Sequence, residues 1–81
     1  MSELTGLVLF VREGCHLCED FLLNLSLDFG LDHEDVAVVD VSSDVALALR
    51  YGLRVPVLTR NGEPIAEGIF DSAQIRQALR L

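Results

Sequence analysis

The sequence predicts one α/β domain over residues 1–81, with elements in the order βαβαββα and a mixed four-stranded sheet with flanking helices. Three observations lead to this fold class. Residues 7–11 are an unbroken apolar run, typical of a strand buried on both faces. A second apolar run at 36–39 follows after the length of a right-handed crossover, which predicts that the two strands are parallel. Asn61-Gly62 is a type I′ hairpin signal, which predicts an antiparallel pair.

The first helix is expected to begin at Cys15 and to end at Gly30, a glycine suited to a C-terminal cap. Between them, apolar residues recur at three- and four-residue steps and mark one helix face. These residues are Cys18, Phe21, Leu22, Leu25 and Phe29.

The second apolar strand ends at Asp40, and a short helix is expected soon after it. Ser42 or Ser43 can be the N-cap of this helix. Val45 and Leu49 would then lie on one face, and Gly52 would end the helix.

The last third of the chain predicts the hairpin and a closing helix. Val55, Val57 and Thr59 alternate as in a strand, and Ile65 begins the returning strand. The closing helix has a capping box and a hydrophobic staple at its start. The box is Asp71 with Gln74, the staple is Phe70 with Ile75, and Ile75, Ala78 and Leu79 form the apolar face.

The chain has two cysteines, Cys15 and Cys18, and both fall at the predicted strand-to-helix turn. The free N–H groups of a helix start stabilise an anion, and thiolates placed there have their pKa lowered from about 8.5 to about 3.5–7.5. Cys15 is therefore the candidate nucleophile. Residues three apart in a helix have Cβ atoms about 5–6 Å from each other, so the two sulfurs can be brought to bonding distance. Cys18, on the apolar face, is the candidate resolving thiol, and the pattern predicts thiol redox chemistry.

Other uses of two thiols are less well supported. A zinc site needs about four ligands, and beyond the pair this chain offers His16 and His33 without a second closely spaced ligand pair. Covalent haem attachment is excluded because Glu19, not histidine, follows Cys18. Inert packing is disfavoured by the position of the pair at a turn. The leading alternative function is a metal or iron-sulfur binding module that uses the same cysteines, and a third is an adaptor that keeps the fold without turnover.

Composition limits the partners and the compartment. The net charge of −7 disfavours nucleic acid and anionic membrane surfaces. The chain begins without a signal-peptide pattern and has no apolar run of the ~18 residues that span a bilayer. We expect a cytoplasmic monomer. In the cytoplasm, a lone Cys-x-x-Cys is more often catalytic than structural.

The element order, with the cysteine pair at the first strand-to-helix junction, resembles the thioredoxin fold at its minimal, glutaredoxin-like size. Residues 12–18, Arg-Glu-Gly-Cys-His-Leu-Cys, resemble the glutaredoxin active-site turn, in which a cationic residue stands three places before the first cysteine. Val55-Pro56 is similar to the family's Val-Pro. Residues 68–71, Gly-Ile-Phe-Asp, resemble the Gly-x-x-Asp stretch of glutaredoxins, and the resemblance covers nearly the whole chain.

This resemblance implies a small dithiol thiol-disulfide oxidoreductase that reduces protein or glutathione mixed disulfides. Cys15 would attack, Cys18 would resolve, and His16 would stabilise the thiolate or shuttle a proton. Such a protein needs no bound cofactor, and glutathione is a candidate reductant.

The same resemblance implies a set of substrate-binding residues. Pro56 would be cis and face the disulfide, and the backbone amide and carbonyl of Val55 would pair with an extended substrate. Gly68 and Asp71 would hold the γ-glutamyl end of glutathione. Two arginines would meet its carboxylates; they are Arg12 and Arg54.

The chain also departs from the family. His16-Leu17 stands where glutaredoxins usually have Pro-Tyr and thioredoxins Gly-Pro, and Glu67 replaces the first of two paired glycines. Carboxylates next to the thiols would raise the pKa of Cys15 and oppose glutathione, which is itself an anion. These carboxylates are Glu13, Glu19 and Asp20.

Overall fold

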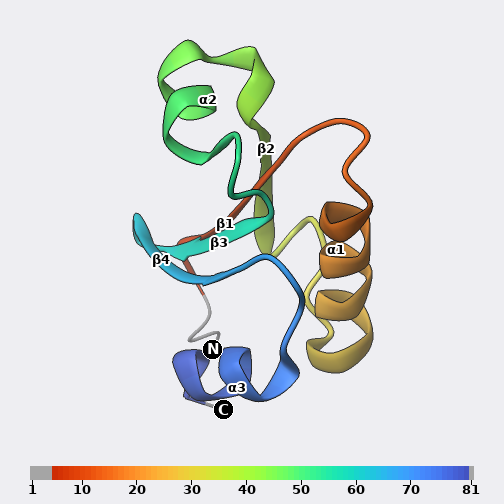
Figure 1. The fold of residues 1–81 in the computed structure, drawn as a ribbon. Helices are drawn as coiled ribbons and strands as arrows, with labels where there is room; N and C mark the ends of the chain where they lie inside the picture. Colours follow the sequence, from red (N-terminus) through yellow and green to blue (C-terminus); the bar gives the residue numbers. More distant parts are fainter. Residues whose placement is uncertain (1–4, 81) are drawn as a thin grey trace.

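In a computed structural model that describes residues 5–80, the chain forms a four-stranded mixed sheet with helices on both sides (Figure 1), which confirms the predicted fold class. The elements are β1 (Leu7–Val11), α1 (His16–Phe29), β2 (Val36–Asp40), the 3-10 turn η1 (Val41–Ser43), α2 (Val45–Tyr51), β3 (Val57–Arg60), β4 (Glu63–Glu67) and α3 (Ser72–Leu79). The short turn η1 is the one addition to the predicted order among the described residues.

The strands lie in the order β2-β1-β3-β4. β1 pairs with β2 in parallel and with β3 in antiparallel orientation, and β3 and β4 form the antiparallel hairpin. β1 and β3 are therefore the inner strands, which explains why both are rich in apolar residues. The carboxyl end of β1 leads directly into the turn that carries the cysteines.

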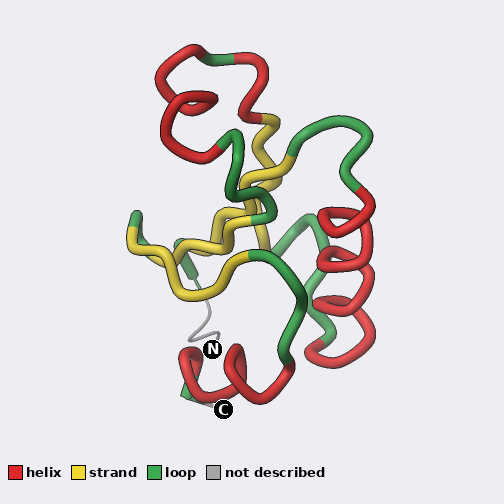
Figure 2. The backbone as a smooth tube through the Cα atoms, viewed as in Figure 1, coloured by secondary structure: helices red, strands yellow, loops and turns green. Residues whose placement is uncertain are grey.

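Each face of the sheet has its own core because successive side chains of a strand point to opposite faces. On one face, Leu9 of β1 lies opposite Leu58 of β3, and both are fully buried. α1 and α3 cover this face with Phe21, Leu25, Ile75 and Leu79. Helices on either side of the strands can be followed in Figure 2.

The other face is covered by α2. Phe10 and Val57 are paired next to Leu9 and Leu58. Their side chains therefore point to the opposite face of the sheet. The ring of Phe10 stacks on that of Tyr51 at the end of α2, with ring centroids 4.4 Å apart. Val41 and Leu47 pack into the same cluster.

The predicted N-cap of the second helix was wrong. Ser42 and Ser43 belong to the 3-10 turn, whose own cap is Asp40. Asp44 is the N-cap of α2, and its carboxylate accepts a hydrogen bond from the Leu47 amide at 3.0 Å. Serine and aspartate are about equal as N-caps, so the local sequence could not separate these neighbours.

The predicted face of this helix was wrong as well. Val45 and Leu49 are exposed, at 78% and 84%. Leu47 and Tyr51 point to the sheet instead, one turn apart on the opposite face.

The hairpin turn has the predicted geometry. Asn61 and Gly62 both have positive φ values, 52° and 85°, as a type I′ turn requires. The returning strand begins at Glu63, two residues before the predicted Ile65. A β-bulge lies in the hairpin, because Thr59 pairs with Pro64 while its neighbour in β3 pairs with Ala66.

Two further ends of elements bear on the site. β3 begins at Val57 rather than at Val55, because Pro56 has no amide hydrogen for a ladder bond. Asp71 caps α3 as predicted, and its carboxylate accepts from the Gln74 amide at 3.1 Å.

Within residues 5–80, no helix is both long and apolar enough to cross a membrane.

Candidate active site at the cysteine pair

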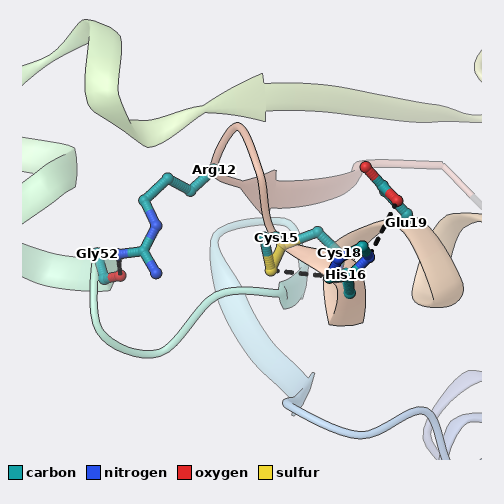
Figure 3. The surroundings of a disulfide bond; sticks show 6 residues. All are labelled: Arg12, Cys15, His16, Cys18, Glu19 and Gly52. Atoms are coloured by element: carbon teal, nitrogen blue, oxygen red, sulfur yellow. Dashed lines mark hydrogen bonds and ion pairs between the residues drawn. A yellow bond between two sulfur atoms is a disulfide. The ribbon is translucent and has the colours of Figure 1, made fainter.

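Cys15 and Cys18 form a disulfide at the start of α1, with their Cα atoms 5.2 Å apart (Figure 3). Cys15 is the N-cap of the helix, with extended backbone angles, and Cys18 lies in the first turn. The amide of Cys18 donates a hydrogen bond of 3.2 Å to the sulfur of Cys15. A free N–H group of the helix start is thus directed at the Cys15 sulfur, as the spacing predicts.

The two cysteines differ in exposure. Cys18 is only 3% exposed, whereas Cys15 is partly exposed. The turn before them is closed by a hydrogen bond of 3.2 Å from the Cys15 amide to the Arg12 carbonyl. Gly14 has a φ of +80° in this turn, a conformation that favours glycine. Cys15 is therefore the more exposed cysteine of the pair in this turn.

Arg12 links this turn to the end of α2. Its guanidinium donates a hydrogen bond of 2.8 Å to the carbonyl of Gly52, as Figure 3 shows. Arg12, which was predicted to bind a carboxylate of the substrate, thus donates to a carbonyl at the end of α2 in the structure. Gly52 begins the segment that leads to Pro56 and β3, so the bond connects the cysteine turn to this second segment.

The segment before β3 carries a cis peptide bond between Val55 and Pro56. The amide of Val55 donates to the Tyr51 carbonyl at 3.0 Å, so this amide, which we expected to pair with substrate, is already used within the chain. The carbonyl of buried Pro56 accepts from the Gly68 amide at 2.9 Å. This last bond connects the second segment to a third one, after β4.

Arg54 is held from two sides. Its Nε and Nη2 atoms donate to the two carboxylate oxygens of Glu67 at 3.4 and 2.7 Å. Its guanidinium carbon also lies 5.5 Å from the centre of the Tyr51 ring. The hydrogen bond with Arg54 lowers the pKa of Glu67, and the same bond raises the pKa of Arg54. Arg54 and Glu67 were not predicted to pair with each other.

His16 lies at the rim of the pair. Its Nδ1 atom is 3.7 Å from a carboxylate oxygen of Glu19, and its side chain is 95% exposed. The imidazole thus lies in solvent beside an acidic group, and the pair is ionic only when the imidazole carries a proton.

The remaining predicted residues lie further along the third segment. Gly68 has a φ of +79°, and Asp71 is exposed at the start of α3. Hydrogen bonds thus bring together the segments of Arg12, Val55-Pro56 and Gly68, whereas none of these bonds reaches Asp71.

The structure also bears on metal binding. Within residues 5–80, no three His, Cys, Asp or Glu side chains are grouped so that they could hold a metal ion. His33, a zinc candidate of the sequence analysis, is exposed between α1 and β2.

The chain is similar to known proteins in both sequence and structure. The model of the glutaredoxin-like domain (DUF836) matches residues 6–80. The chain belongs to this glutaredoxin-like family. Among solved structures, it is similar to a structural genomics target protein from X. campestris, determined by X-ray crystallography. The two share 32% sequence identity over 91% of this chain and 95% of the other, with a TM-score of 0.77. A search of curated proteins gives no match.

Family membership confirms the resemblance drawn from the sequence and supports a thiol redox role for the cysteine pair. As a glutaredoxin-like domain, the chain places its Cys-x-x-Cys pair at the start of the first helix. Glu67 accepts hydrogen bonds from the guanidinium of Arg54 through both carboxylate oxygens.

Proposed function

We propose that this glutaredoxin-like chain is a dithiol thiol-disulfide oxidoreductase that reduces protein or glutathione mixed disulfides. The observation that carries the proposal is the unequal pair at the start of α1. Cys15 is partly exposed and receives a helix-start amide, while Cys18 is buried one turn further on.

The first step begins from the reduced pair. The Cys15 thiolate, stabilised by the free N–H groups of α1, attacks one sulfur of the substrate disulfide. A new bond forms between Cys15 and that sulfur, and the other substrate sulfur leaves as a thiolate that takes a proton from water or from His16. The product of this step is a mixed disulfide.

In the second step, Cys18 loses its proton and attacks the sulfur of Cys15. The mixed disulfide breaks, the remaining substrate thiolate leaves, and the Cys15–Cys18 disulfide forms. The substrate has gained two electrons and the pair has lost two. A dithiol reductase, or two molecules of glutathione, returns the pair to its reduced state. The Cα separation of 5.2 Å supports this step because it lies within the usual disulfide range.

The resemblance to glutaredoxins also supports substrate-binding roles around the pair. Val55 would offer its carbonyl to an extended substrate, since its amide is already bonded. Arg12 would meet a substrate carboxylate with guanidinium donors other than the one that bonds the Gly52 carbonyl. Gly68 and Asp71 would receive the γ-glutamyl end of a glutathione mixed disulfide.

Turnover tests the proposal. The protein should accelerate the reduction of a disulfide-bonded protein such as insulin by dithiothreitol, and Cys15→Ser should abolish the acceleration. Ser43→Ala, a substitution at an exposed residue beyond β2, is the matched control and should keep it. A wild-type rate equal to the rate without protein would contradict the proposal. A purified protein with visible absorption and bound iron would favour the iron-sulfur alternative.

A further inference from the structure

We propose that Glu67 is a specificity-determining residue that occupies Arg54 and thereby directs the chain toward disulfides without carboxylates near the sulfur. The inference rests on the proposed function, whose substrate class it narrows.

The ion pair uses one of the guanidinium edges through which Arg54 can bind a carboxylate. Nε and Nη2 form one edge of the guanidinium, and this edge suits a carboxylate that binds through both oxygens. Glu67 binds there with both of its oxygens, at 3.4 and 2.7 Å. An incoming carboxylate would have to displace Glu67 or approach a guanidinium whose charge is already balanced.

Arg54 is also fixed in place. Its guanidinium lies over the Tyr51 ring at 5.5 Å, and that ring is buried and stacked on Phe10. The partner of Arg54 is fixed as well, because the hairpin bulge places Glu67 directly opposite Val57. Without the bulge, the two-residue turn would bring Ala66 to that position. The bulge thus brings Glu67 to a position from which its side chain reaches Arg54.

The pair lies beside the two segments that the proposed function assigns to substrate binding. Arg54 directly precedes Val55-Pro56, and Glu67 directly precedes Gly68, whose amide bonds the Pro56 carbonyl. Two apolar residues of these segments are exposed: Leu53, which precedes Arg54, is 98% exposed, and Ile69, which follows Gly68, is 76% exposed. The surroundings thus offer apolar contacts and a neutralised arginine.

The overall charge favours the same substrates. The chain carries a net charge of −7, and Glu13, Glu19 and Asp20 are exposed near the cysteines in the sequence. Because like charges repel, an anionic disulfide gains little from the approach to this site. The substrate class is therefore narrowed to disulfides without carboxylates near the sulfur.

The experiment compares two small disulfides of opposite design. The reduced protein is mixed with dithiodipropionate, which has two carboxylates, or with hydroxyethyl disulfide, which is neutral, and the second-order rates of oxidation are measured. Their ratio, anionic over neutral, cancels changes that affect both reactions. Glu67→Gln should raise this ratio by about two- to fivefold, the effect that one exposed ion pair can have.

Two variants separate the role of Arg54 from the loss of a negative charge. Glu63→Gln removes a carboxylate from the other end of β4 and should raise the ratio less than Glu67→Gln. The double variant Arg54→Gln with Glu67→Gln keeps the net charge and removes the guanidinium, so its ratio should stay near the wild-type ratio. The gain in Glu67→Gln should also shrink in about 1 M salt, where the screening length is about 3 Å.

Each outcome decides a specific point. An unchanged ratio in Glu67→Gln, or an equal gain in Glu63→Gln or in the double variant, would overturn the inference and leave the pair as a brace between two segments. If Glu67→Gln does not fold, as judged by circular dichroism, Glu67→Ser is measured against the same criteria. Failure of the wild type to react with the neutral disulfide would instead contradict the proposed function, so the two failures are distinguishable.

Discussion

The amide of Cys18 donates a hydrogen bond to the sulfur of Cys15 at 3.2 Å, so Cys15 caps the helix that carries its disulfide partner. One interaction thereby couples the start of α1 to the reacting sulfur. The same amide lies where negative charge develops when Cys15 becomes a thiolate, and a helix start favours that charge. The spacing of three residues serves the disulfide and the cap together.

In the reduced protein, Cys15 should react with iodoacetamide faster than Cys18 near neutral pH. Cys15 is partly exposed and stabilised as a thiolate, whereas Cys18 is 3% exposed. Mass spectrometry of peptides from a quenched reaction measures both rates. In denaturant the two rates should approach each other. A faster Cys18 in the folded protein would contradict the roles assigned here.

Cys18→Ser should trap the first intermediate. This variant keeps the nucleophile and removes the resolving thiol, so a mixed disulfide between Cys15 and a substrate sulfur should accumulate. Intact-mass measurement after mixing with a small disulfide detects the added group. Ser26→Ala, at an exposed position further along α1, is the control and should form the internal disulfide instead. Absence of the adduct in Cys18→Ser would contradict attack by Cys15.

Asp71→Ala should lower the free energy of unfolding by about 0.5–2 kcal/mol, because the Gln74 amide at the start of α3 loses its acceptor. Asp71→Ser should recover most of this loss, because serine is about as good an N-cap. Urea denaturation measures both values. The serine variant also separates capping from any role of the Asp71 charge in substrate binding, since it keeps the cap and removes the charge. Equal losses in both variants would show that the cap contributes little.

Acid should weaken the Arg54–Glu67 pair. The hydrogen bond from Arg54 lowers the pKa of Glu67 below its ordinary value of 4.5, so the folded state binds the proton less well than the unfolded state. The stabilisation is fully present above that ordinary value and is lost as the pH falls through the lowered pKa. The unfolding free energy of the wild type should therefore fall more steeply in acid than that of Glu67→Gln.

Denaturant titrations at a series of pH values test this difference. Asp40, whose pKa is also lowered by its hydrogen bond from Ser42, is present in both proteins and cancels in the comparison. Parallel curves for the two proteins would mean that the Arg54–Glu67 pair contributes no measurable stability.

Much of the fold could be predicted because its signals are local. The apolar run of β1, the helical spacing that ends at Gly30 and the Asn61-Gly62 turn each identify one element. The second helix was harder because Ser42, Ser43 and Asp44 are all good N-caps. The choice among them depends on which face meets Phe10 across the sheet, a contact between distant parts of the chain.

The site likewise has features with a local sequence signal and features that depend on distant parts of the chain. The cysteine pair could be predicted because its chemistry depends on a spacing of three residues within one helical turn. The partner of Arg54 could not, because it depends on the bulge that moves Glu67 opposite Val57. The available signal was the opposite charge of Arg54, just before one predicted strand, and Glu67, near the end of the returning strand. The hydrogen bond from Arg12 to Gly52 could not be predicted from the sequence, because its acceptor is a backbone carbonyl, which every residue type has.

The central claim is that Cys15 and Cys18 act as a two-electron dithiol. The most direct test mixes fully reduced protein with a limiting amount of a protein disulfide, quenches with acid and alkylating reagent, and counts thiols by mass spectrometry. We predict that each substrate disulfide reduced is matched by one chain with an intramolecular Cys15–Cys18 disulfide. Chains that keep two free thiols while the substrate is unchanged, or that are linked only to one another, would contradict the account.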